Sequence, residues 1–307
     1  MSSRSSDRRA ATGAVCCVML ATLVLAGCRQ STPQQMSRTA SQATQDETPQ
    51  LLAANAVSGD SVLRVCADPN NLPFSNERGE GFENAIAKLV ASDLHERLEY
   101  TWWAQRRGYV RNTLAANKCD VWVGVASGMG PLLTTQPYYR STYVFMTRAN
   151  DPIRVASFND PVLKRVRIGV QLVGDDGANT PPAHALSRRH IISNVRGYHL
   201  ESDYREPNPP SRIVEALAHH DIDVAVVWGP LAGYFARREA VPLRLTAVSP
   251  QIDLPFLPFV FDIAMGARRS DSVLVRRLDS VIVRRRPEID RILASYGVPR
   301  ADAPLVQ

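Results

Sequence analysis

Beyond residue 60 the chain alternates segments typical of strands with segments typical of helices, and this alternation occurs twice. Each unit follows the order strand, helix, strand, helix, strand; the first ends at "DVWVGV" and the second at "DVAVVW". Parallel strands need long crossovers, so the pattern predicts an α/β fold with two lobes, each a mixed or mostly parallel sheet flanked by helices. Ser141–Arg148 and Pro242–Val248 would cross between the lobes as hinge strands, and Phe259–Gly266 would rejoin the first unit.

The predicted elements also set the boundaries of the lobes. The first lobe is expected over 61–149 plus 243–300, the second over 150–242, and a C-terminal tail over 301–307. In the first lobe we expect a polar helix from about Arg107 to Asn117. In the second we expect a helix over Ser211–His220, capped by Ser211, and another that begins near Leu231.

The N-terminal part of the chain is typical of an exported protein. Three arginines precede the apolar run Ala10–Ala26, which is short for a membrane span and suited to a secretory signal. The run ends in "LAGC", the form of a bacterial lipoprotein processing site, so we expect 1–27 to be removed and Cys28 to be acylated. Arg29 in place of aspartate favours the outer membrane, and 28–60, rich in Gln, Ser and Thr, reads as a flexible tether in the periplasm. An ordinary signal peptide with a chance cysteine is the alternative.

The charge of the chain does not indicate nucleic-acid binding. Its formal net charge is +6, and nearly all basic residues are arginines. A basic run near the C-terminus lacks interleaved aromatic residues, which favours a solvated helix face. A face that docks a partner protein is the alternative. The run consists of Arg268, Arg269, Arg276, Arg277, Arg284, Arg285 and Arg286.

Two of the five cysteines, Cys66 and Cys119, would remain free in the mature chain after signal removal and acylation. An even pair in an oxidising compartment could form a disulfide. The two residues lie at different positions along two predicted strands, which could place their α-carbons too far apart. The chain lacks a Cys-x-x-Cys-His motif, and its six histidines lack zinc-ligand spacing, so we predict neither a metal nor a cofactor.

The order and lengths of the elements resemble the type II periplasmic solute-binding proteins. Within that group the chain is most similar to the solute-binding-like accessory proteins associated with methanol dehydrogenases that use pyrroloquinoline quinone (PQQ). The resemblance covers residues 64–235 and rests on long, unusual stretches. They are "RVCADPNNLPFSNERGEGFEN", "QRRGYVRNTL", "CDVWVGV", "PYYRSTYVFMTR", "GVQLVGDDGANTPPAHAL" and "DVAVVWGPLAGYF".

The strand ends of both lobes should converge on a cleft, which supplies the candidate binding residues. For several of them a structural role is the alternative to ligand binding. Asp68 and Gly174–Gly177 could form turns, Tyr138–Arg140 could pack in the hinge, and Trp228 could fill the interface between the lobes. The candidates are Asp68, Asn70, Asn71, Phe74, Trp102, Trp103, Arg106, Arg107, Ser127, Tyr138, Tyr139, Arg140, Asp175, Asp176, Asn179, Thr180, Trp228 and Tyr234.

Both charged anchors of an amino-acid receptor are missing from this cleft. Amino-acid receptors that resemble this fold place an arginine after the third strand for the carboxylate, and an aspartate at the end of the last strand of the second lobe for the ammonium group. Here no basic residue follows the third strand before Arg140, and the second position is Trp228. A zwitterion would be desolvated without its ion pairs, at a cost of several kcal/mol. The cleft better suits a ring, an alcohol-like solute or a protein segment.

Three classes of function compete. The resemblance implies a lipid-anchored accessory protein that binds a PQQ-dependent methanol dehydrogenase, as its large subunit or apo form, and assists its maturation or activation. The alternative is a receptor that delivers a non-amino-acid solute to an ABC importer. An enzyme is not expected, because no nucleophile–base constellation or cofactor fingerprint is visible and Asp175–Asp176 alone is thin support for a cation site. We expect a small molecule or peptide in the cleft and no nucleic acid.

Overall fold

The structure is a computed structural model that describes residues 61–173, 179–199 and 204–301, all within one compact unit, Asn55–Gln307. The strands are β1 (Val62–Ala67), β2 (Asn70–Asn71), β3 (Ser75–Asn76), β4 (Arg97–Trp102), β5 (Val121–Ala126), β6 (Leu133–Thr134), β7 (Tyr139–Arg148), β8 (Ile168–Leu172), β9 (Val195–His199), β10 (Val224–Trp228), β11 (Leu243–Ala247), β12 (Ile252–Asp253), β13 (Leu257–Pro258) and β14 (Val260–Ala267).

The helices are α1 (Phe82–Leu94), α2 (Tyr109–Asn112), α3 (Pro181–Arg188), α4 (Arg212–Ala218), α5 (Gly229–Ala236), α6 (Ser272–Arg284) and α7 (Arg286–Ser295), with 3₁₀ turns η1 (Pro161–Lys164) and η2 (Pro209–Ser211). Among the residues that the structure describes, no helix has the length and apolar character needed to span a membrane.

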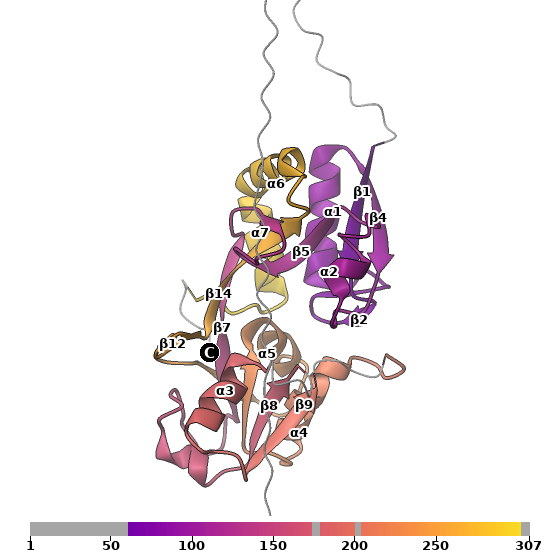
Figure 1. The fold of residues 1–307 in the computed structure, drawn as a ribbon. Helices are drawn as coiled ribbons and strands as arrows, with labels where there is room; N and C mark the ends of the chain where they lie inside the picture. The colour runs from indigo at the N-terminus through magenta and orange to yellow at the C-terminus, as the bar shows by residue number, and fades with distance from the viewer. Residues whose placement is uncertain (1–60, 174–178, 200–203, 302–307) are drawn as a thin grey trace, which may run out of the picture. The chain divides into compact units, whose positions relative to one another are not determined.

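The main sheet has the order β4-β1-β5-β14-β7-β10-β8-β9 (Figure 1). At one end β1 pairs in parallel with β4 and β5, and at the other β8 pairs in parallel with β9 and β10. The two strands in the middle, β14 and β7, are antiparallel to their neighbours. We call β4-β1-β5 with α1, α2, α6 and α7 lobe I, and β10-β8-β9 with α3, α4 and α5 lobe II. The predicted two-lobed α/β fold is confirmed.

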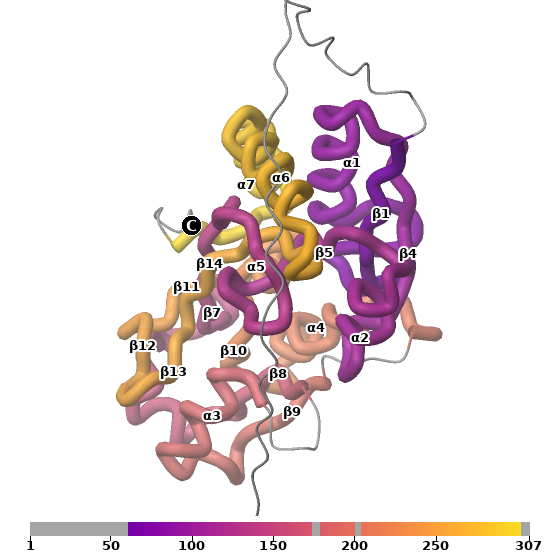
Figure 2. Tube along the Cα trace, turned by 45° about the horizontal axis from the view of Figure 1, so that its top comes forward, coloured from indigo at the N-terminus to yellow at the C-terminus, as the bar shows by residue number. Residues whose placement is uncertain are grey.

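The strand β7 links the two lobes. Its first residues, Tyr139–Thr142, pair with β14, and Tyr143–Met146 pair with β10. The strand expected to cross back, β11, pairs with β7 over Val144–Arg148 on the lobe II side. The chain then makes the β12–β13 hairpin, and β14 completes the return (Figure 2). The hinge therefore consists of β7 together with β11 and β14.

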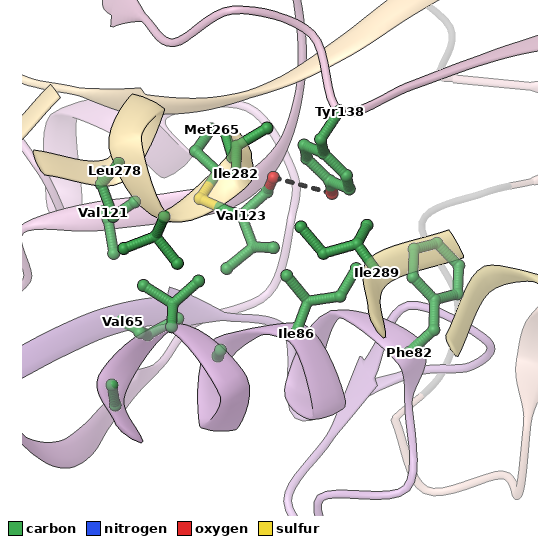
Figure 3. Packing of buried hydrophobic residues seen from close by; sticks show 14 of the residues in the cluster. Val65, Phe82, Ile86, Val121, Val123, Tyr138, Met265, Leu278, Ile282 and Ile289 are labelled. Atoms are coloured by element: carbon green, nitrogen blue, oxygen red, sulfur yellow. Dashed lines mark hydrogen bonds between the residues drawn. The ribbon is translucent and has the colours of Figure 1, made fainter. Parts of the chain in front are cut away.

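Lobe I has its core between the sheet and the helices α1, α6 and α7 (Figure 3). Phe82, Ile86 and Val90 are buried at a spacing of four residues along α1, so one helical face meets the sheet. Lobe II has one core on each face of its sheet, since α4 and α5 cover one face and α3 the other. Each lobe therefore buries an apolar core of its own.

Three arginines of the C-terminal basic run join α6 and the residue after it to the C-terminal end of α1 and the residues that follow α1. Both α6 and α7 lie beside α1 in Figures 1 and 2. Arg277 pairs with Glu96 at 2.6 Å, and Arg284 and Arg285 both pair with Asp93. The carboxylates are largely buried: the Glu96 and Asp93 side chains are 4% and 7% exposed. These three arginines therefore serve the packing of lobe I.

Three helices differ from their predicted form. The polar helix expected from Arg107 to Asn117 is only the single turn α2, because the chain bends to bury Tyr109 and Leu114 against the two cysteines. The helix α5 begins at Gly229, two residues before the predicted start. The Ser211 hydroxyl does not cap α4; it bonds the Asn208 carbonyl and the Glu215 carboxylate.

Cys66 and Cys119 form a disulfide, with their α-carbons 5.4 Å apart. This lies within the usual range for disulfides, so the expected excess separation does not occur. The reason is the bend before β5: the Lys118 carbonyl accepts a hydrogen bond from the Thr101 hydroxyl of β4, and Thr101 is the neighbour of Cys66 in the sheet. The bend thus carries Cys119 toward β1.

Candidate functional site

A pocket of about 350 Å³ lies where the strand ends of lobes I and II and the hinge strands meet. A volume of this order suits a small ligand. Lobe I, lobe II and the hinge all contribute to its lining. The lining residues are Asp68, Asn70, Asn71, Phe74, Gln105, Tyr143, Gln171, Tyr204, Pro210, Trp228, Leu231, Phe261 and Ile263.

The polar end of the pocket is built around Asp68, directly after β1. Its carboxylate accepts hydrogen bonds from the Gln105 N–H at 2.6 Å, the Asn70 N–H at 2.9 Å and the Tyr204 hydroxyl at 2.7 Å. Burial raises the pKa of the Asp68 carboxyl, and the hydrogen bonds from Gln105, Asn70 and Tyr204 oppose that rise. The residue is only 1% exposed, so the carboxylate is fixed and largely dry.

Two of the contacts around Asp68 come from across the cleft. Tyr204 and Glu206 belong to the segment between β9 and η2 of lobe II, and the Glu206 carbonyl accepts a hydrogen bond from the Asn70 side chain at 2.9 Å. The Arg106 guanidinium lies over the Tyr204 ring, 5.4 Å from its centroid. The two lobes are therefore joined at the mouth of the pocket by polar contacts. Water can take over such contacts when the lobes separate, which it cannot do for apolar packing.

Three aromatic rings form another part of the lining. Trp228 ends β10 and stands beside Tyr143 of β7 in the sheet. The Trp228 and Tyr143 rings are 5.2 Å apart at 62°, and the Phe261 ring lies 5.8 Å from Trp228 and 6.4 Å from Tyr143, at 71° and 76°. The rings thus meet edge to face in a corner, a favourable arrangement for aromatic groups.

Gln171, at the end of β8, positions this wall. Its side-chain oxygen accepts a hydrogen bond from the backbone N–H of Trp228 at 3.1 Å. Its carbonyl accepts one from the Thr180 hydroxyl at 2.6 Å, just before α3. The Asn179 side chain accepts a hydrogen bond from the Val173 N–H. Asn179 and Thr180 therefore support the pocket from behind and do not line it.

Five of the residues predicted for the cleft lie together around the pocket: Asp68, Asn70, Asn71, Phe74 and Trp228. The other candidates on lobe I do not line it. Trp102 stacks on Tyr100, Trp103 lies under Lys118, and Arg107 and Ser127 are absent from the lining. Arg106 is absent from the lining too, but it lies over Tyr204 at the mouth of the pocket.

The remaining predicted residues pack elsewhere, lie on the surface or fall outside the described chain. Tyr138 and Tyr139 are buried in the core of lobe I, and Arg140 lies 3.9 Å from Asp262. Tyr234 stacks on Tyr296, with Arg238 over its ring. Cys28, Asp175 and Asp176 lie outside the described residues.

The sequence prediction missed Gln105, Tyr143, Gln171, Tyr204 and Phe261. Tyr143 and Phe261 stand in the hinge strands, where an aromatic residue reads as packing. Gln171 did give a signal, because it is a polar residue at the end of an apolar strand. Tyr204 gave none: it lies in an irregular, proline-rich segment and meets Asp68 across 136 positions of sequence.

A second acid lies buried in lobe I. Glu83, in the first turn of α1, packs its carboxyl against Gly124 of β5, where an added Cβ would stand 1.9 Å from the Glu83 oxygen. Burial raises the pKa of Glu83 to about 8, with a smaller contribution from the charge of Asp68. Glu83 is therefore neutral over most of the physiological range.

The described lining of the pocket contains one acid and no arginine, lysine or histidine. The region after the third strand, where amino-acid receptors carry their arginine, is absent from that lining. Among the described residues there is also no group of three or more His, Cys, Asp or Glu side chains able to hold a metal ion.

Comparison with known proteins places this geometry in a family. No protein-family model matches the chain. Protein MoxJ of Methylorubrum extorquens is 32% identical over 255 residues, which cover 80% of this chain and 84% of the relative. Protein MoxJ of Paracoccus denitrificans is 29% identical over 267 residues, covering 81% and 92%.

Among solved structures, the periplasmic binding protein XoxJ from Methylobacterium extorquens AM1 is 34% identical to the chain and superposes with a TM-score of 0.64. The match covers 78% of this chain and 100% of XoxJ. The two-lobed architecture is thus that of a periplasmic binding protein. Given its similarity to MoxJ over most of that protein's length, the chain belongs to the MoxJ family.

Proposed function

We propose that the chain is a periplasmic accessory protein that assists the maturation or activation of a PQQ-dependent methanol dehydrogenase, without chemistry of its own. The observation that carries the proposal is the pocket: a cleft lies between the lobes, Trp228 lines it, and no arginine, lysine or histidine lines the described wall. The resemblance to amino-acid receptors implies an acid at the position of Trp228, which supports a different occupant. Membership of the MoxJ family and the resemblance to dehydrogenase-associated proteins support the choice of partner.

The N-terminal sequence and the relatives support a periplasmic, lipid-anchored location. The signal-like segment and Cys28 support export and acylation, and XoxJ is a periplasmic binding protein. We infer that the chain is anchored through lipid on Cys28, at the outer membrane, with 28–60 as the tether. A lipid-anchored protein of this kind would meet its dehydrogenase at the membrane surface.

The pocket also favours a second candidate, a receptor of an ABC importer for a small molecule other than an amino acid. Its volume of about 350 Å³ and its mixed aromatic and amide lining would hold such a solute. The contacts of Tyr204 and Asn70 across the cleft would then form on closure.

Co-purification with the cognate dehydrogenase separates the two candidates. The full chain, tagged and extracted in non-ionic detergent, should retain the dehydrogenase, detected by native mass spectrometry. Trp228→Ala should reduce the recovered complex because it removes a large aromatic contact at the cleft. Trp103→Ala is the matched control, since Trp103 lies on the surface of lobe I, 37% exposed. No association with wild type, together with saturable stabilisation by a small solute, would favour the receptor.

A further inference from the structure

The described wall of the pocket contains a single charged side chain, Asp68. Three donors already occupy its carboxylate: the N–H groups of Gln105 and Asn70 and the hydroxyl of Tyr204. The charge therefore acts through space, and the oxygens have little capacity left for a donor on a ligand. A ligand that matches this wall brings positive charge without demanding hydrogen bonds.

The Arg106 guanidinium lies over the ring of Tyr204 and is absent from the described lining. Its charge acts on Asp68 from outside that lining. An anion in the pocket would face the Asp68 charge with no Arg, Lys or His on the described wall. A zwitterion would have the same difficulty with its carboxylate. Both classes of ligand are disfavoured.

The aromatic wall has the complementary property. Tyr143, Trp228 and Phe261 meet at angles of 62°, 71° and 76°, so their ring planes form a corner. A flat ligand stacks best between parallel rings, whereas a compact, rounded group fits a corner. Aromatic faces attract cations, and quaternary ammonium groups are the ligands for which proteins use several aromatic rings together.

We propose that this pocket binds a small organic cation whose ammonium group is alkylated, of about the size of choline. The alkyl groups pack into the corner of Tyr143, Trp228 and Phe261, and the charge is balanced through space by Asp68. The hydroxyl or other polar end of the ligand meets the amide side chains of Asn71 and Gln171. This site goes beyond the accessory role and does not depend on it. A bound cation would regulate the accessory protein in one case and be the transported solute in the other.

Isothermal titration of the full chain in non-ionic detergent tests the site with three probes. Choline should bind roughly tenfold or more tightly than 3,3-dimethylbutan-1-ol, its neutral carbon isostere, because only the cation gains from the aromatic faces and Asp68. Glycine betaine, which adds a carboxylate to the same trimethylammonium group, should also bind more weakly than choline. Equal binding of choline and the isostere, or no heat with choline at millimolar concentration, would overturn the proposal.

Two substitutions separate charge from shape. Asp68→Asn should narrow the difference in affinity between choline and the neutral isostere without abolishing it, because the three aromatic rings still attract the cation. Trp228→Leu, which keeps apolar volume, should weaken choline by roughly tenfold and the isostere by less. Trp103→Leu, outside the pocket, should leave both unchanged. If Asp68→Asn and Trp228→Leu both keep wild-type melting temperatures and wild-type affinity for choline, the assignment is wrong. If the wild-type chain binds choline but does not retain the dehydrogenase, the accessory role is refuted and the choline site stands.

Discussion

The buried acid Glu83 should make the stability of the protein fall as the pH rises. Burial raises the pKa of its carboxyl in the folded protein from 4.5 to about 8. Between these values the unfolded chain is ionised while the folded protein keeps its proton, so unfolding releases a proton. Stability from this source is complete below about pH 4.5 and is lost progressively up to about pH 8.

The size of the effect follows from the same two values. Each unit of difference between a folded and an unfolded pKa corresponds to about 1.4 kcal/mol, so the full loss is on the order of 5 kcal/mol. Glu83→Gln replaces the carboxyl by an amide of the same shape that does not ionise. The variant should therefore be more stable than wild type at pH 8, by roughly 3–5 kcal/mol, and close to wild type at pH 4.5.

Urea unfolding followed by tryptophan fluorescence at several pH values between 4.5 and 8 measures this difference. Asp68, whose pKa is also raised by burial, adds a slope of the same sign that the variant keeps. Glu77→Gln is the matched control, because Glu77 is exposed and its loss should leave the wild-type slope unchanged. If Glu83→Gln and wild type lose stability in parallel, Glu83 is not a buried neutral acid.

Three further changes test the packing. Arg148→Met should lower the free energy of unfolding by roughly 3–5 kcal/mol, because Arg148 is only 4% exposed and its guanidinium donates to two buried carbonyls and pairs with two aspartates. Replacing Cys66 and Cys119 together by alanine should cost about 4 kcal/mol by the chain-entropy estimate, since the bond closes a loop of 53 residues. Gly233→Ala should lower the melting temperature by several degrees, because an added Cβ would stand 1.9 Å from the Gly297 carbonyl oxygen.

Each change has a control and a refuting result, read by urea unfolding or differential scanning calorimetry. Arg154→Met removes an exposed arginine and should change stability little, so equal effects at Arg148 and Arg154 would contradict the buried role. Gly130→Ala meets no atom within 4 Å and should be neutral; an equal loss at Gly233 and Gly130 would contradict the close-contact argument. Reducing agent should destabilise wild type but leave the double alanine variant unaffected.

The alternation of strands and helices predicted the two lobes, because a buried strand is a short apolar run in the sequence and an amphipathic helix repeats its apolar residues every three to four positions. Local turns were harder. The bend that ends α2 after Asn112 depends on burial of Tyr109 and Leu114 beside the Cys66–Cys119 bond, which is a tertiary effect. The separation of the cysteines was misjudged for the same reason.

The pocket was partly predictable. Asp68, Asn70, Asn71, Phe74 and Trp228 follow strands whose ends must face the cleft, and strand ends can be read from the sequence. Gln105 and Gln171 also lie at or after strand ends and could have been included. Tyr143, Phe261 and Tyr204 reach the pocket through hinge strands or the irregular segment before η2, which leave no periodic signal. Candidates that lie elsewhere, such as the buried Tyr138 just before the hinge strand, were chosen by their position in the chain, and position alone does not fix the direction of a side chain.

The accessory role is tested most directly by the specific activity of the methanol dehydrogenase purified from cells that lack this chain, compared with cells that express it from a plasmid. We predict that the dehydrogenase polypeptide is made in both and that its activity per molecule is much lower without the chain. Equal activity per molecule in the two preparations would contradict a role in maturation or activation.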